Sequence, residues 1–128
     1  MNPWDEFAAR IDLDPDEFSI YPAMAQQIQA PAVVLVPNDP WVQSTAYQYD
    51  TERYLAICLV ESTAPQDGLD RLHTMIHAIR EAGGDGWEIG DVSGVRSARI
   101  PDDSTNYLGS WVQLTFRNCD HSVEEGSS

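Results

Sequence analysis

The stretch that decides the fold runs from Arg53 to Ala82 and opens with the unbroken apolar run Tyr54-Leu55-Ala56-Ile57-Cys58-Leu59-Val60. These residue types favour strands. A strand with one wet face alternates apolar and polar residues. Because this run does not alternate, we expect both faces of the strand to be covered.

A change of period marks a helix after this strand. Apolar residues recur at spacings of three and four, so they share one helical face. They are Leu69, Leu72, Met75, Ile76 and Ile79. Thr63 and Gln66 form a candidate capping box, and Pro65 suits the first turn. The glycines at 83 and 84 favour the helix end. The helix is expected to cover one face of the strand, and something else must cover the other.

Shorter elements flank this core. The sequence predicts a short helix at 2–10, strands at 18–21 and 31–37, a strand at 87–99 with a bulge near Gly90, and a last antiparallel strand at 107–117. Residues 41–49 are expected to be a loop or the first arm of a long hairpin. This order predicts a single α+β domain over residues 1–117, with a mainly antiparallel sheet of four to five strands, one long amphipathic helix on a face and a short N-terminal helix. Residues 118–128 are expected to be a disordered acidic and polar tail.

The chain is strongly acidic, with a formal net charge of -14, and every basic residue is an arginine. Such a chain repels phosphate backbones, so sequence-specific DNA binding is not expected. The acidity has two interpretations: solubility, or a surface that lies beside DNA without binding it or that imitates DNA. No apolar run approaches the roughly 20 residues of a membrane helix, and no secretion signal opens the chain. We therefore expect a cytoplasmic protein with no membrane partner.

Two groups of residues resemble metal-binding sites, but each lacks residues that its type of site requires. Acidic residues alternate in the segment Asp12-Leu13-Asp14-Pro15-Asp16-Glu17, but the positions where a calcium loop requires Gly and Glu hold Glu17 and Ala23. An acidic solvated turn is the favoured interpretation. His73 and His77 lie four apart with Asp70 nearby, but the glutamate that marks zinc-binding helices is absent between them. No metal, cofactor or catalytic residue is predicted.

Several short motifs follow one another in a fixed order along the chain. The strand end Ile20-Tyr21-Pro22 precedes a proline-led apolar strand and an Asn-Asp-Pro-aromatic turn, over residues 31–42. A long strand, a helix opening with Gly68-Leu69-Asp70-Arg71-Leu72 and a C-terminal hairpin follow. Together these ordered features resemble the tail terminator proteins of long-tailed bacteriophages, and the resemblance covers roughly residues 18–117. It departs from the family at the N-terminus, where residues 3–10 allow only about two helical turns.

The resemblance implies a structural virion protein rather than an enzyme. Such proteins form a ring, usually a homo-hexamer, on the last ring of the tail tube. The ring ends tube growth and joins the tail to the head connector protein. The implied partners are therefore other copies of the chain, the tail tube protein and the connector. The implied location is the tail–neck junction of the virion, after assembly in the host cytoplasm. DNA would pass through without specific binding, because an acidic channel repels phosphates.

Two sets of residues are candidates for these contacts. Aromatic residues among polar neighbours are typical of contact surfaces, although Trp41 could instead fold back on the core. The candidate subunit or partner interface contains Trp4, Phe7, Trp41, Tyr47, Tyr49 and Trp111. The candidate acidic surface or lumen contains Asp12, Asp14, Asp16, Glu17, Asp102 and Asp103. The alternatives are another head-to-tail joining protein, an acidic DNA-mimic inhibitor, and a small enzyme with a pocket between helix and sheet.

Overall fold

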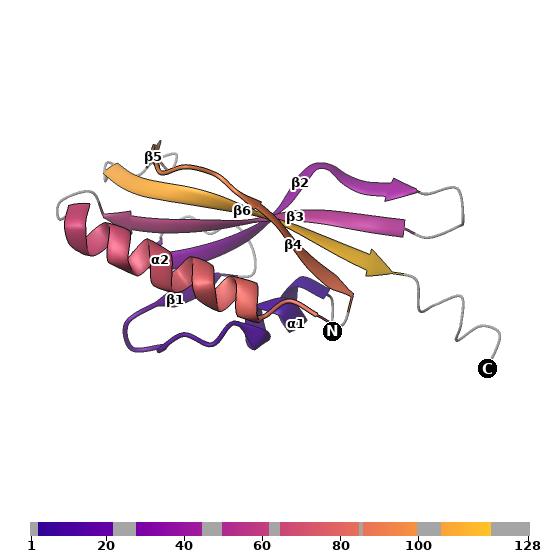
Figure 1. Ribbon diagram of the computed structural model, residues 1–128, viewed down its shortest axis with the longest axis horizontal. Coiled ribbons are helices and arrows are strands. Elements are labelled where there is room, and N and C mark those ends of the chain that lie inside the picture. Colours follow the sequence, from indigo (N-terminus) through magenta and orange to yellow (C-terminus); the bar gives the residue numbers. More distant parts are fainter. Residues whose placement is uncertain are drawn as a thin grey trace.

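The computed structural model describes residues 3–21, 28–44, 50–61, 65–84, 86–99 and 106–118. Within these residues the chain forms two helices and six strands (Figure 1). In chain order they are α1 (Pro3–Arg10), β1 (Ser19–Tyr21), β2 (Ala32–Ser44), β3 (Asp50–Glu61), α2 (Pro65–Glu81), β4 (Trp87–Val92), β5 (Arg96–Arg99) and β6 (Asn106–Asn118).

All six strands belong to one mixed sheet. Its order is β1-β2-β3-β6-β4, with β5 pairing β6 beside β4. β1 runs parallel to β2, and every other pair is antiparallel. The predicted α+β class, with a mainly antiparallel sheet of four to five strands, is therefore wrong, because the protein is mostly β.

The sheet contains more strands, and a longer β2, than the sequence predicts. Two segments account for the difference. β2 continues beyond Pro37 to Ser44, and a register shift between Pro37 and Val42 accommodates the extra residues. Among the described residues β2 pairs with β1 only at 32–34, so proline in its later part breaks no ladder with β1. The expected strand at 87–99 divides into β4 and β5, both of which pair with β6.

Residues 41–44 form the first arm of a hairpin, one of the two alternatives for this segment. Val42 pairs with Glu52, and Ser44 pairs with Asp50. The far ends of β2, β3 and β6 extend past both helices (Figure 1). Residues 45–49 lie outside the described residues.

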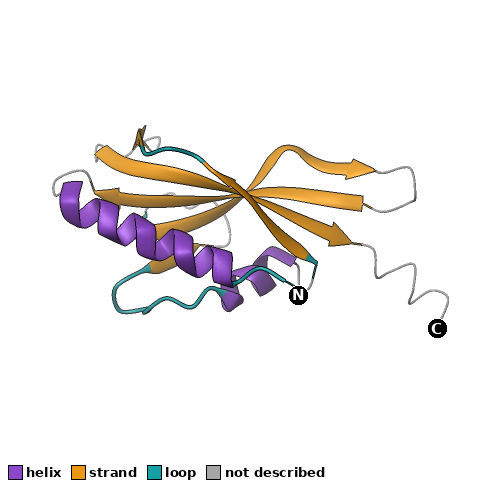
Figure 2. Ribbon diagram, viewed as in Figure 1, coloured by secondary structure: helices purple, strands orange, loops and turns teal. Residues whose placement is uncertain are grey.

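One face of the sheet carries the main core. Tyr54, Ala56, Cys58 and Val60 of β3 are all buried on this face. Both helices lie over it (Figure 2). The apolar residues that α1 and α2 place in this core are Phe7, Leu72, Met75, Ala78 and Ile79. The helical period therefore predicted the packing face of α2 correctly over most of its length.

Leu69 is the exception to this pattern, because its side chain is 44% exposed. Gly68 takes the inward position in the first turn of α2. A Cβ atom on Gly68 would lie 3.0 Å from Cγ2 of Val60, so the helix approaches β3 more closely here than a larger residue allows. Thr63, the expected cap, lies outside the described residues, and the capping box stays a prediction.

The opposite face of β3 is covered only in part. Leu59 is buried in a small second cluster with Ile28 and Tyr107. Leu55 and Ile57, further along the same face, are half-buried. The prediction that both faces of this strand are covered is thus correct near Leu59 and wrong near Leu55.

The predicted bulge near Gly90 is confirmed. Ile89 pairs with Leu114 and Val92 pairs with Val112, and the register shifts between the two pairs. Both partners in β6 are buried on the helical face, so the bulge turns Ile89 and Val92 toward the same side of the sheet. Gly84 has a φ of 116° and exchanges two backbone hydrogen bonds with Trp87, so its positive φ belongs to the turn that leads into β4.

Replacing Gly86 by alanine is expected to lower the free energy of unfolding by about 1–2 kcal/mol. Gly86 has a φ of 96°, and an added Cβ atom would lie 3.2 Å from Cε1 of Phe116. Urea unfolding followed by circular dichroism measures the change. Gly94→Ala is the matched control, because no atom lies within 4 Å of its added Cβ. Equal losses in the two variants would show that the conformation of Gly86 is not the cause.

Candidate interaction surfaces

Six aromatic side chains meet where α1 crosses the sheet. They are Trp4, Phe7, Trp41, Tyr54, Trp87 and Phe116. Trp87 is central, with its ring centroid 4.6 Å from that of Phe7, 4.8 Å from Phe116 and 5.5 Å from Tyr54. Aromatic pairs at these separations add to the stabilisation from apolar burial. This aromatic cluster therefore fixes α1 to the sheet.

Trp41 forms the outer edge of the aromatic cluster. Its ring lies 6.2 Å from that of Trp4 and 6.4 Å from that of Tyr54, yet the side chain is 44% exposed. Trp41 thus folds back toward the core and also presents a surface. Tyr54 donates a hydrogen bond to Glu52 beside it. Burial, reinforced by that hydrogen bond, raises the pKa of the Tyr54 hydroxyl well above its usual range, although a hydrogen bond with Trp41 opposes the shift.

The structure separates the other aromatic candidates. Phe7 is fully buried in the subunit core, so it presents no surface. Trp4 is half-buried within the aromatic cluster. Trp111 is half-buried on the opposite face of the sheet, where it pairs with Ile57 and not with a residue of the aromatic cluster. Tyr47 and Tyr49 lie outside the described residues.

The sheet face turned away from the helices carries a second candidate surface. Val36 is opposite Leu55, and Ile57 is opposite Trp111, so these four side chains form a continuous patch across three strands. All four are half-buried. The register places Arg53, Arg96 and Arg117 on the same face. We call these seven residues the open sheet face.

The arginines of the open sheet face differ in their contacts. Arg96 lies over the Trp111 ring, with its guanidinium carbon 5.7 Å from the ring centroid. Arg117 forms an ion pair with Glu88 at 3.2 Å. Arg53 is half-buried and forms no ion pair with a described side chain. Three of the seven arginines of this acidic protein therefore share one face with a half-buried apolar patch.

Four of the predicted acidic residues lie together on the helical side of the molecule. Asp12, Asp14, Asp16 and Glu17 are exposed in the connection from α1 to β1. The Asp14 carboxylate accepts a hydrogen bond from the amide of Asp16 at 2.9 Å, the pattern of an Asx turn. Asp102 and Asp103 lie outside the described residues.

Glu17 connects this acidic turn to α2. Its carboxylate pairs with the guanidinium of Arg71 at 3.3 Å. Both side chains border an open hollow of about 360 Å³ that Asp67 and Asp70 also line. Three carboxylates and one guanidinium therefore surround the hollow. Its local charge is negative, in contrast to the open sheet face.

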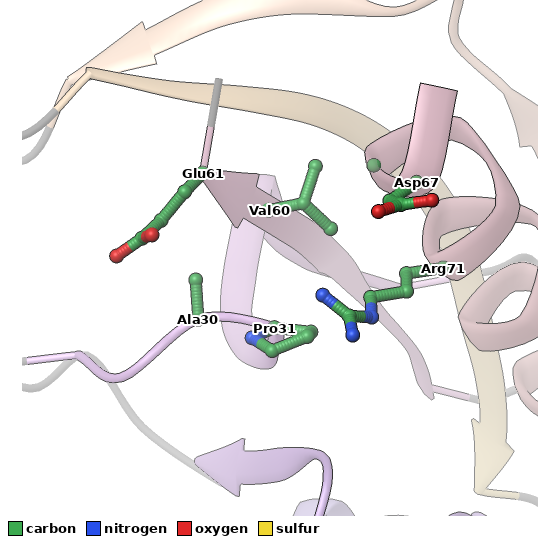
Figure 3. Close-up of a pocket in the computed structure, with 7 residues that line it drawn as sticks. Ala30, Pro31, Val60, Glu61, Asp67 and Arg71 are labelled. Atoms are coloured by element: carbon green, nitrogen blue, oxygen red, sulfur yellow. The ribbon is translucent and has the colours of Figure 1, made fainter. Parts of the chain in front are cut away.

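A smaller pocket of about 70 Å³ lies between the start of α2 and the end of β3 (Figure 3). The side chains of Glu61, Asp67 and Arg71 supply its charges (Figure 3). The enzyme alternative requires a pocket at this place, between helix and sheet. Ligand pockets usually enclose about 300–1,000 Å³, so this one suits water-sized molecules.

The histidines of α2 lie on its solvent side. His73 is exposed, and His77 lies 3.9 Å from Glu81 in the next turn. Over the described part of the chain, no group of three or more His, Cys, Asp or Glu side chains is placed so that it could hold a metal ion. Neither α1 nor α2 is long and apolar enough to cross a membrane.

No family model matches this chain, and no curated protein matches it.

Sequence reasoning did not identify most of the open sheet face. Arg53 and Ile57 were not among the candidates, because strand 53–60 was expected to be covered on both sides. Arg96 lies in the expected strand at 87–99, and no pattern in the sequence singled it out. One signal was available. The last strand alternates, placing Trp111, Gln113 and Thr115 on one partly polar face. Pairing that strand with 53–60 extends this face to Leu55 and Ile57.

Proposed function

We propose that this chain is a structural assembly protein that forms a ring, caps a phage tail tube, ends tube growth and joins the tail to the head connector. The open sheet face is the single observation that supports self-association. A continuous patch of four large apolar side chains that are each partly exposed to water is typical of a surface that another protein surface covers. The sequence resemblance supplies the tail tube and the connector as further partners.

The charge distribution is compatible with a ring that DNA crosses. The exposed carboxylates of the turn at 12–17 repel phosphates, so a channel that they line would let the genome move without binding it. Another head-to-tail joining protein would use the same properties. An acidic DNA mimic would use the carboxylates and would have no role for the open sheet face.

The native mass tests the ring. Light scattering across a concentration series should give six copies of the 14.3-kDa chain, and negative-stain images should show closed particles of one size. Added to growing tail tubes, the protein should cap one end, and deleting its gene should leave tails of uncontrolled length. Tails of normal length in the deletion strain would refute the terminator function.

A further inference from the structure

We infer that the open sheet face is the docking surface for the acidic helical side of a second copy of this chain. The inference rests on the proposed self-association and specifies the two surfaces that meet. The helical side here means the hollow lined by Glu17, Asp67 and Asp70, together with the adjoining surface of α2.

The first surface combines apolar area with positive charge. Leu55, Ile57 and Trp111 would lose their remaining contact with water on docking, which supplies non-directional stabilisation. Arg53 has no ionic partner among the described side chains, and Arg96 is held by the Trp111 ring rather than by a carboxylate. Both guanidinium groups are thus available for carboxylates of a partner. The register also places Glu61 and Glu88 on this face, but Glu88 already pairs with Arg117.

The second surface has the complementary charge. Asp67 and Asp70 are exposed on α2 beside the hollow, and only Glu17 of its three carboxylates is paired with an arginine. Electrostatic complementarity of this kind fixes the orientation of partners and disfavours incorrect contacts.

The two surfaces lie on opposite sides of one subunit. Docking one on the other therefore makes a head-to-tail contact, in which each copy uses both surfaces. Contacts of this type close into rings when the rotation between copies permits. Two open sheet faces meeting each other would instead produce a symmetric dimer and leave the acidic side unused. The opposite charges of the two sides favour the head-to-tail arrangement.

A charge exchange tests the inference. Variant one carries Arg53→Glu and Arg96→Glu on the open sheet face, and variant two carries Asp67→Arg and Asp70→Arg on α2. In each variant like charges would meet at every contact. The concentration at which half of the chains assemble should rise about tenfold or more, which corresponds to about 1.4 kcal/mol per contact. An equimolar mixture should recover assembly, because each variant then meets only its complement.

Arg80→Glu is the matched control, since it reverses an exposed arginine on α2 that borders neither surface. It should assemble like the unmodified protein, and circular dichroism should show all variants folded. Assembly of variant two on its own at the unmodified concentration would overturn the inference, as would a mixture that stays dissociated. A monomer at every concentration of the unmodified protein would also overturn it. Tube capping by such a monomer would leave the proposed function intact, so the two failures are distinguishable.

Discussion

Replacing Trp87 by alanine is expected to lower the free energy of unfolding by about 3–5 kcal/mol. Trp87 is 5% exposed and contacts rings from α1, β3 and β6. Removing the indole leaves a cavity that these rigid side chains cannot fill. The loss is a large share of the roughly 5–15 kcal/mol that stabilises an ordinary domain. Because Phe7 packs directly on this ring, α1 should also lose its main attachment to the sheet.

Urea unfolding monitored by far-ultraviolet circular dichroism measures this effect. Trp41→Ala is the matched control, because it removes the same side chain from a position that is 44% exposed. Its expected cost is about 1–2 kcal/mol, from partial burial and two ring contacts. If Trp87→Ala cost no more than Trp41→Ala, the aromatic cluster would not be the attachment of α1. Near-ultraviolet circular dichroism should show reduced aromatic signals in both variants.

The sequence predicts the local elements well where one periodic signal dominates. The helical stripe of Leu72, Met75 and Ile79 and the apolar strand ending at Val60 lie where their patterns indicate. The fold class was wrong because the extra strand content depends on tertiary pairing. β2 continues through two prolines because one of its edges is bonded to β3, while no described strand pairs with its other edge at these positions.

The candidate surfaces were harder to predict for a related reason. An unbroken apolar strand looks the same whether its second face meets the same subunit or another one. Phe7 and Trp41 both looked like exposed aromatics, but the bulge in β2 and the path of α1 bring Trp4 and Trp41 together and bury Phe7 completely. No local signal in the sequence specifies where α1 crosses the sheet.

Stability is expected to fall steeply above pH 9, and Cys58 should account for much of the loss. Burial raises the pKa of the Cys58 thiol from 9.0 to about 12. Between these values the unfolded chain releases this proton while the folded chain retains it, so the free energy of unfolding decreases as the pH rises. At pH 11 the Cys58 contribution amounts to about 2–3 kcal/mol. The Tyr54 hydroxyl, whose pKa is also raised, acts in the same direction from about pH 10 upward.

Urea titrations at pH 8, 9, 10 and 11 measure how the free energy of unfolding changes with pH. The comparison with Cys58→Ala isolates the part of this change that the thiol causes. The alanine variant should be less stable at pH 8, because a fully buried sulfur is lost, but its stability should fall less steeply with pH. The two curves should therefore converge toward pH 11. Tyr54→Phe is the second comparison, and it should reduce only the portion of the slope above about pH 10. Parallel curves for the protein and Cys58→Ala would show that the thiol ionises without unfolding. The Cys58 side of the sheet would then be accessible to water, contrary to its complete burial beneath α2.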